Sequence, residues 1–459
     1  MDGGTDVTVV PDPDSVPPEV VFRIPAHGED QVSVRTPIRA VFSEAVKLGA
    51  NPVTLLADGV AIATTSALSD DAKVLTVSPK SEIAVPAKMS LSFEDVTDLR
   101  GNSLVRAPWS WTDPLWLRVG DTLEQEGTIS FPRIAAGTGE RVNVALALPQ
   151  TTESGMPLTV QAIDTPKSTW ALRGARVGMT LDRPNLLTES DGTLVVAYKD
   201  PLNGSVRVQR LEDGVWRQIG GPFPSVQGNG AVALAADAHG MLFLAYDEST
   251  EAGTTNVVVK TLPRGFDSWS PLAETVNDPS AETATDLQSL TLDKNGIPYV
   301  AYRTATSDAY VRFWSVTKWS SVGTSVNGPQ QAVKSMTIGL DDTSHLLAVL
   351  SWHDRYLTTR HAQLTRFDGV NWVDGGDVAN DALIDAAFLG ATRDGHMFAY
   401  LGTDEQFFLL DVTTKGWVAM PPPAVRPPKG FASAAVDPTG VPIFGWTDGA
   451  AMNVVRLNR

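Results

Sequence analysis

Between residues 19 and 112, apolar and polar residues alternate in short segments. Apolar residues occupy every second position in Ile38–Phe42, Val74–Val77 and Met89–Phe93, which places them on one face of a strand. Turn signals such as Ala57-Asp-Gly59 separate these segments at intervals of roughly 8 to 12 residues. The pattern predicts a β-sandwich over residues 19–112.

From residue 113 onward the chain repeats a tryptophan followed four positions later by glycine. Successive tryptophans are separated by 54, 46, 53, 50, 53 and 45 residues. Four short strands with their turns need about this length, as in the blades of a propeller. The motif occurs at Trp116–Gly120, Trp170–Gly174, Trp216–Gly220, Trp319–Gly323 and Trp372–Gly376, and more weakly at Trp269 and Trp417.

Between the tryptophans lies a second signal, an Asp-x-x-Gly turn before a strand that ends in an aromatic residue. Aspartate at the first position can accept hydrogen bonds from the turn backbone, and glycine at the fourth tolerates a positive φ. The turn therefore predicts a hairpin between the first and second strands of each repeat. Examples are Asp237–Gly240 before Leu242–Tyr246, Asp293–Gly296 before Tyr299–Tyr302 and Asp437–Gly440 before Ile443–Trp446.

The two ends of the repeat region complement each other. Seven second strands can be found, and after the last of them only Met452–Leu457 remains, a third strand without a fourth. Trp116–Gly120 has the pattern of a fourth strand but lacks three strands before it. We therefore predict an all-β chain in which a seven-bladed β-propeller over residues 113–459 is closed by residues near 115–120.

Two family resemblances follow from these motifs. Phe42–Val46, Leu75–Pro79 and Val96–Asn102 resemble segments of bacterial Ig-like domains found in surface-layer and adhesin proteins, which implies a spacer outside the cell. The repeat resembles bacterial seven-bladed propellers of the broad sialidase-like, lectin and YVTN-type group. Its turn departs from the sialidase Asp-box by one residue before the glycine and lacks the box's tryptophan.

Residues 1–18 are acidic and rich in glycine and proline, and we interpret them as a flexible tether. The segment resembles the stretch that follows the lipidated cysteine of bacterial surface lipoproteins. That resemblance implies a secreted or cell-surface protein, held at the outer membrane by a lipid anchor that this sequence does not contain. An ordinary flexible N-terminus is the alternative interpretation.

Composition excludes several classes of function. The net charge of −17 repels a phosphate backbone, so nucleic acid is not an expected partner. The chain has no cysteine, and no pair of its six histidines has the spacing of a metal site. We expect no metal and no cofactor.

The candidate binding residues are the aromatic residue that ends each second strand and the polar residues after it. Equivalent strand ends lie on one face of a propeller, where aromatic planes and charged groups together suit a sugar. The alternative is that the aromatic residues pack between neighbouring blades. The candidates are Tyr198, Asp200, Tyr246, Asp247, Tyr302, Arg303, Trp352 and His353.

These observations predict a non-catalytic recognition or adhesion protein that binds a glycan or a surface protein. One alternative is an exo-acting carbohydrate-active enzyme, a sialidase-like hydrolase or a lyase. That activity needs several arginines at one place, but Arg183, Arg303, Arg355 and Arg393 lie in different repeats. A scaffold within a surface assembly is the other alternative.

Overall fold

The computed structural model is all-β. Its described residues contain strands and no helix, so they include no helix that could cross a membrane. The chain forms two compact units, one of residues 1–117 with 457–459 and one of residues 118–456. The structure describes residues 16–148, 155–165, 168–225, 231–251, 253–278, 285–340, 346–354, 360–380, 385–391, 397–402, 407–413, 416–420 and 432–458.

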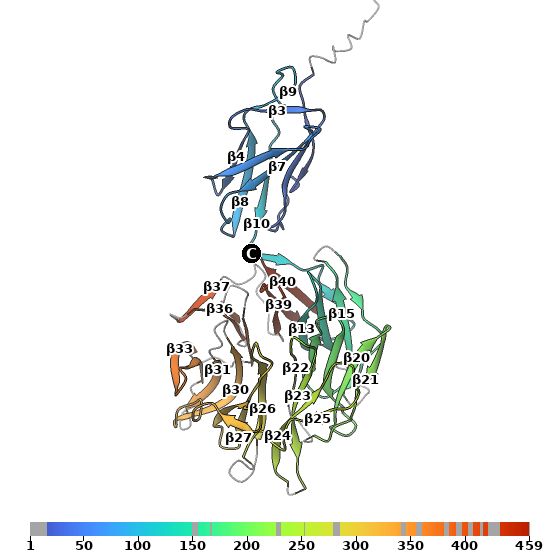
Figure 1. Ribbon diagram of the computed structural model, residues 1–459, viewed down its shortest axis with the longest axis vertical. Helices are drawn as coiled ribbons and strands as arrows, with labels where there is room; N and C mark the ends of the chain where they lie inside the picture. Colours follow the sequence, from blue (N-terminus) through green and yellow to red (C-terminus); the bar gives the residue numbers. More distant parts are fainter. Residues whose placement is uncertain are drawn as a thin grey trace, which may run out of the picture. The chain divides into compact units, whose positions relative to one another are not determined.

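The first unit is a sandwich of two four-stranded sheets (Figure 1). One sheet has the order β1-β2-β7-β6 and the other β10-β8-β4-β5, and a short pair, β3-β9, lies beside them. Alternate residues of both sheets point inward, and Phe42, Met89 and Trp111 lie in the core between them. The predicted sandwich is confirmed. The strands are β1 (Val20–Ile24), β2 (Ile38–Phe42), β3 (Val46–Leu48), β4 (Val53–Ala57), β5 (Val60–Ile62), β6 (Thr64–Leu68), β7 (Val74–Pro79), β8 (Ala87–Phe93), β9 (Val96–Asp98) and β10 (Ser110–Asp113).

The described residues of the second unit form seven antiparallel sheets that follow one another in chain order (Figure 1). Six are consecutive in sequence: β13 (Ser130–Ala136), β14 (Val142–Ala147), β15 (Met156–Ile163), β16 (Ala171–Leu172) and β17 (Gly178–Thr180); β18 (Asn185–Thr188), β19 (Leu194–Lys199), β20 (Val206–Glu212) and β21 (Val215–Gln218); β22 (Val232–Ala236), β23 (Leu242–Ser249), β24 (Thr255–Leu262) and β25 (Ser270–Pro271); β26 (Thr285–Leu292), β27 (Pro298–Thr304), β28 (Ala309–Trp314) and β29 (Trp319–Ser321); β30 (Gln331–Leu340), β31 (Leu346–Asp354), β32 (Arg360–Phe367) and β33 (Trp372–Asn380); β34 (Asp385–Ala391), β35 (Met397–Gly402), β36 (Phe407–Thr413) and β37 (Gly416–Met420).

The seventh sheet combines the two ends of the repeat region. Its order is β11-β40-β39-β38, and β12 also pairs with β40. Leu123 lies opposite Met452, and the amide of Val119 donates to the carbonyl of Val454 at 2.9 Å. The strands are β11 (Trp116–Arg118), β12 (Leu123–Glu124), β38 (Ala432–Val436), β39 (Pro442–Asp448) and β40 (Ala451–Leu457).

The first strands of the seven sheets contact one another in turn. Each contacts the first strand of the next sheet, and β38 of the last sheet contacts β13 of the first. First and second strands pair antiparallel, so the start of a first strand lies at the same end of its sheet as the end of the second strand. Polar residues at these two positions are therefore brought together in each sheet.

The Asp-x-x-Gly turns have the predicted conformation. Asp237 Oδ1 accepts the backbone amides of His239 and Met241, both at 2.9 Å, and Gly240 has a φ of +80°. The turns at Asp293 and Asp437 make the equivalent bonds. The carboxylate thus satisfies two amides that a short hairpin would otherwise leave unpaired.

Candidate functional site

The tyrosines that end the second strands are buried in the core. Tyr198 is 2% exposed, and Tyr246 and Tyr302 are 0% exposed. Each lies in an apolar cluster that joins its own sheet to the preceding one. Neither face of these rings is open to a sugar, and packing between sheets, the alternative interpretation, describes their position.

The charged residue that follows each of these tyrosines lies in an environment different from that of the tyrosine. Asp247 is 2% exposed, and its carboxylate accepts the amide of Leu287 on the first strand of the next sheet, at 2.9 and 3.1 Å. Arg303 likewise reaches the next sheet, where it donates to the carbonyls of Val333 and Lys334 at 3.2 and 3.1 Å. Lys199 occupies the same position in the second sheet and is 2% exposed. This position places charged groups between neighbouring sheets.

The charges of three carboxyl groups act on the Lys199 ammonium. Burial lowers the pKa of Lys199, and the charges of Asp247, Asp182 and Asp286 oppose that shift. Burial, reinforced by the charge of Asp286, raises the pKa of Asp247 to about 8, although Lys199 and the Leu287 amide favour the charged form. Asp247 is therefore mostly protonated at neutral pH.

Asp286 begins the first strand of the fourth sheet and lies directly opposite Arg303 in the strand register. The Arg303 guanidinium donates to Asp286 Oδ2 at 2.6 Å, and both side chains keep part of their surface exposed. Burial raises the pKa of Asp286, and Arg303 opposes the shift. The pair is accessible at one side while Asp247 lies beneath the surface.

Arg183, whose backbone amide donates to Asp182 Oδ1 at 2.7 Å, belongs to a pair of arginines. Arg133 on β13 and Arg183, just before β18, are close enough that their like charges repel, and burial together with this repulsion lowers the pKa of Arg133 to about 10. Arg133 donates to the carbonyl of Pro184 at 3.3 Å, and Arg183 lies over the Phe131 ring with its central carbon 5.6 Å from the ring centroid. Within the described residues, neither guanidinium is paired with a carboxylate.

We define the charged cluster as Asp182, Lys199, Asp247, Asp286 and Arg303 together with the arginine pair Arg133 and Arg183. Because the pKa of Asp247 is raised to about 8, this carboxyl group contributes little negative charge at neutral pH. Within a chain whose net charge is −17, the cluster thus combines the basic groups of Lys199, Arg303 and the arginine pair with carboxyl groups of which Asp247 is mostly uncharged. Such a site favours an anionic or strongly hydrogen-bonding ligand.

The remaining predicted site residues lie apart from the cluster. Asp200 is 7% exposed and binds Arg207 and the amide of Leu202 within its own hairpin. Trp352 stacks on His361 with ring centroids 4.2 Å apart, and its indole nitrogen has no hydrogen-bond partner among the described residues. His353 follows on the same strand and is half-buried.

Sequence reasoning singled out Asp247 and Arg303 but missed Asp182, Asp286 and Arg133. Asp182 and Arg133 belong to no repeated motif, so no sequence signal singled them out. Asp286 could not be found by extending the Asp293–Gly296 hairpin backward, because a shift of one residue between Leu287 and Ser289 brings Asp286, rather than Leu287, opposite Arg303. Arg355 and Arg393, which were considered for an arginine trio, lie outside the described residues, as do residues 1–15 of the predicted tether.

Comparison with known proteins identifies the class of the first unit and the fold of the second. Residues 14–112 match the family described as bacterial Ig-like domain, a domain typical of surface proteins. No curated protein matches the chain. A solved polysaccharide lyase, an ulvan lyase, is 10% identical with a TM-score of 0.54 and covers 73% of this chain and 94% of its own.

Two further solved structures are similar over comparable lengths. A second polysaccharide lyase is 9% identical with a TM-score of 0.49 and covers 74% of this chain and all of its own. The six-bladed β-propeller lectin of Aleuria aurantia, with its fucose recognition mode, is 12% identical with a TM-score of 0.42, covering 70% of this chain and 98% of its own. At these identities the likeness concerns the fold alone. The described residues are all-β, the first unit contains a bacterial Ig-like domain, and the second unit is similar in fold to the ulvan lyase.

Proposed function

We propose that the seven sheets are the blades of one seven-bladed β-propeller over residues 113–459, closed by β11 and β12, and that residues 19–112 are its Ig-like partner domain. The pairing of β12 with β40 supports this closure, as does the contact between β38 and β13. A first-to-last pairing removes an open strand edge, which propellers otherwise have to protect.

The proposed function is non-catalytic recognition of a glycan through the charged cluster. The observation that carries it is that the charges of Asp247 on the third sheet and Asp286 on the fourth both act on Lys199 on the second sheet, while Arg303 binds Asp286. Paired cations and carboxylates offer donors and acceptors for sugar hydroxyls. The arginine pair, which has no carboxylate partner in the described part of the chain, adds a place for a carboxylate or sulfate on the sugar.

The cluster favours binding over chemistry because its members are held by the fold. Both oxygens of Asp247 accept the Leu287 amide, and Arg303 is tied to two backbone carbonyls of the next sheet. Groups fixed in this way position a ligand without a large entropy cost. Trp352, half-buried beside His353, is proposed as a further stacking surface, separate from the cluster.

A panel of immobilised neutral, uronate-containing and sulfated glycans tests this function. The full chain should bind acidic members of the panel and release them as salt increases, because screening weakens accessible charge pairs. If correctly folded protein binds no glycan on the panel, the glycan function is wrong and a surface-protein partner takes its place.

A carbohydrate-active enzyme is the second candidate, and one observation favours it. Asp247 holds a proton near neutral pH beside Asp286, and such a pair of carboxyl groups can divide acid and base roles. Release of new reducing ends or unsaturated sugars from the bound glycans would establish this activity, and its loss in Asp286→Asn would assign it to the cluster. Binding without turnover supports the non-catalytic function.

We further propose that the protein acts outside a bacterial cell. The Ig-like domain would act as a spacer, and residues 1–18 as a tether that connects it to a lipid anchor at the outer membrane. Labelling of the native protein with a lipid precursor, followed by fractionation of the envelope, tests this location. A native protein that incorporates no lipid and remains in the cell interior would contradict it.

A further inference from the structure

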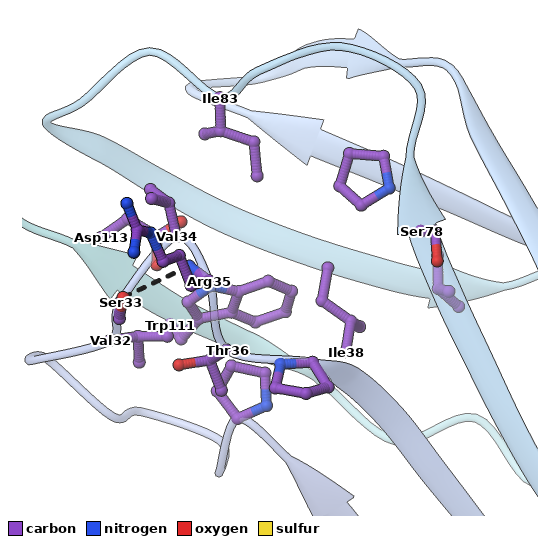
Figure 2. Close-up of a pocket in the computed structure, with 14 residues that line it drawn as sticks. Val32, Ser33, Val34, Arg35, Thr36, Ile38, Ser78, Ile83, Trp111 and Asp113 are labelled. Atoms are coloured by element: carbon purple, nitrogen blue, oxygen red, sulfur yellow. Dashed lines mark hydrogen bonds between the residues drawn. The ribbon is translucent and has the colours of Figure 1, made fainter. Parts of the chain in front are cut away.

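A pocket of about 200 Å³ lies within the Ig-like domain, independent of the charged cluster. Its walls come from both sheets and combine apolar with polar residues, and Figure 2 shows Trp111 and Ile38 between Asp113 on one side and Ser78 on the other. Liquid water takes up about 30 Å³ per molecule, so the pocket holds about six or seven waters or one aliphatic side chain. Its size therefore suits a small group rather than a whole sugar ring.

The pocket contains one buried carboxyl group with a free acceptor. Asp113 ends β10 and is 1% exposed, and its Oδ1 has no hydrogen-bond partner among the described residues. Burial raises the pKa of Asp113 to about 6, while a hydrogen bond from Trp111 partly opposes the shift. The group is mostly ionised at pH 7.5. A buried carboxylate without a full set of hydrogen-bond partners costs free energy. A ligand that donates a hydrogen bond to it removes part of that cost.

The neighbouring arginine does not supply that donor. Arg35 also lines the pocket, but its side chain is exposed and it forms no ion pair with Asp113. The rim of the pocket is fixed: the side chain of Asn458 donates to the carbonyl of Val32 at 3.0 Å and accepts the amide of Val34 at 3.0 Å. The pocket is therefore preformed, and a ligand does not have to order it.

We propose that this pocket binds a primary ammonium group on a short aliphatic chain, with the ammonium donating to Asp113 Oδ1 and the methylene groups packing on Trp111 and Ile38. An ammonium offers three donors and a positive charge, which matches a single unpartnered carboxylate oxygen. The aliphatic residues of the wall suit the methylene stem in the way that proteins bury lysine stems. The same chemistry is found in a small free amine and in the lysine side chain of a protein.

The test is a titration of the full chain, labelled at the isoleucine δ-methyl groups, with n-butylammonium at pH 7.5. The methyl signals of Ile38 and Ile83, both in the pocket wall, should shift and saturate with a dissociation constant of about 1 mM. Butan-1-ol, similar in size and uncharged, should bind at least about tenfold more weakly. Butyrate should not shift these signals, because it is negatively charged like Asp113 and is repelled by it.

Two variants separate binding from damage to the domain. Asp113→Asn removes the charge and should weaken butylammonium binding by about tenfold or more, and Ile83→Trp should block the space without touching the carboxyl group. Lysine blocked at both ends, compared with n-butylammonium, distinguishes a protein lysine from a free amine as the source. The proposal is overturned if butyrate or butanol binds as well as butylammonium, or if no probe shifts the two signals at about 50 mM, in which case the pocket holds water only.

Discussion

The indole nitrogen of Trp170 donates a hydrogen bond of 2.8 Å to the carbonyl of Asp121, 49 positions earlier in the chain. The same bond recurs from Trp216 to Arg173, from Trp269 to Ile219 and from Trp372 to Val322, at 2.8 to 3.0 Å. Each acceptor lies next to the glycine of the preceding Trp-x-x-x-Gly segment. The repeated motif is thus one device in which the glycine of one sheet makes room for the tryptophan of the next.

Gly120→Ala tests this device at its first occurrence. Gly120 has a φ of +67°, and a Cβ there would lie 2.2 Å from Ile163 Cδ1 and 3.2 Å from Trp170 Nε1. Gly139 has nearly the same φ, +66°, with no atom within 4 Å of its Cβ position, so Gly139→Ala is a matched control. The positive φ alone costs alanine about 1–2 kcal/mol, and crowding should add about 1–3 kcal/mol at Gly120.

The measurement is the free energy of unfolding of the second unit in denaturant. Gly120→Ala should be less stable than Gly139→Ala by at least about 1 kcal/mol. Equal losses in the two variants would show that the Trp170 contact does not constrain this position.

A disulfide tests the closure of the ring. Glu124 on β12 lies opposite Ala451 on β40, and facing residues of an antiparallel pair have Cα atoms about 4.5–5.5 Å apart, within the range of a disulfide. Because the chain has no cysteine, Glu124→Cys with Ala451→Cys can form only this intramolecular bond. The double variant should oxidise spontaneously and become more resistant to unfolding by about 3 kcal/mol.

Peptide mass analysis under non-reducing conditions identifies the bond, and reduction should remove the added stability. Two free thiols in the folded, oxidised protein would mean that β12 does not pair with β40 in solution.

Asp247 makes stability depend on pH. Its pKa is raised from 3.8 to about 8 in the folded state, so the folded chain keeps a proton that the unfolded chain releases. The stabilisation of the protonated form is complete below about pH 4 and is lost as the pH rises through about 8. The protein should therefore lose stability between pH 5 and pH 9.

Asp247→Asn keeps an oxygen that accepts the Leu287 amide and removes the titration. Since one pKa unit corresponds to about 1.4 kcal/mol, the change in unfolding free energy between pH 5 and pH 9 should shrink by at least about that amount. Asp267→Asn, at an exposed position in the same sheet, is the control and should follow the wild type. An unchanged pH profile in Asp247→Asn would show that this carboxyl group is ionised in the folded protein.

The repeat and the sandwich could be predicted because their determinants are local. Strand alternation, the Asp237 turn and the Trp216–Gly220 spacing each depend on residues close in sequence, and these elements occur where predicted. The third strand at Met452–Leu457 pairs with β11 and β12, and the closure of a propeller by this pairing stays a prediction.

The binding residues were harder to predict because they depend on which sheet ends meet. Tyrosine after a buried strand suggests a ligand surface, but Tyr246 faces the neighbouring sheet, and only the next residue, Asp247, reaches the charged cluster. Arg133 and Arg183 lie close together although they are 50 positions apart in the sequence, and no motif identifies either of them. Such contacts can be recognised only once the arrangement of the sheets is known.

The central claim is that the charged cluster binds an acidic glycan through its accessible arginines. Arg183→Ala removes a guanidinium that is half-buried and has no carboxylate partner among the described residues, and Arg217→Ala removes an exposed one on β21, whose side chain is 60% exposed. A charge-assisted hydrogen bond contributes about 1.5–3 kcal/mol, which is about a tenfold to hundredfold change in affinity.

The most direct measurement is calorimetric titration of an acidic glycan from the panel into wild type, Arg183→Ala and Arg217→Ala, with thermal melts to show that each is folded. The account predicts that Arg183→Ala binds at least about tenfold more weakly and that Arg217→Ala binds like wild type. Equal affinities for wild type and folded Arg183→Ala would contradict it.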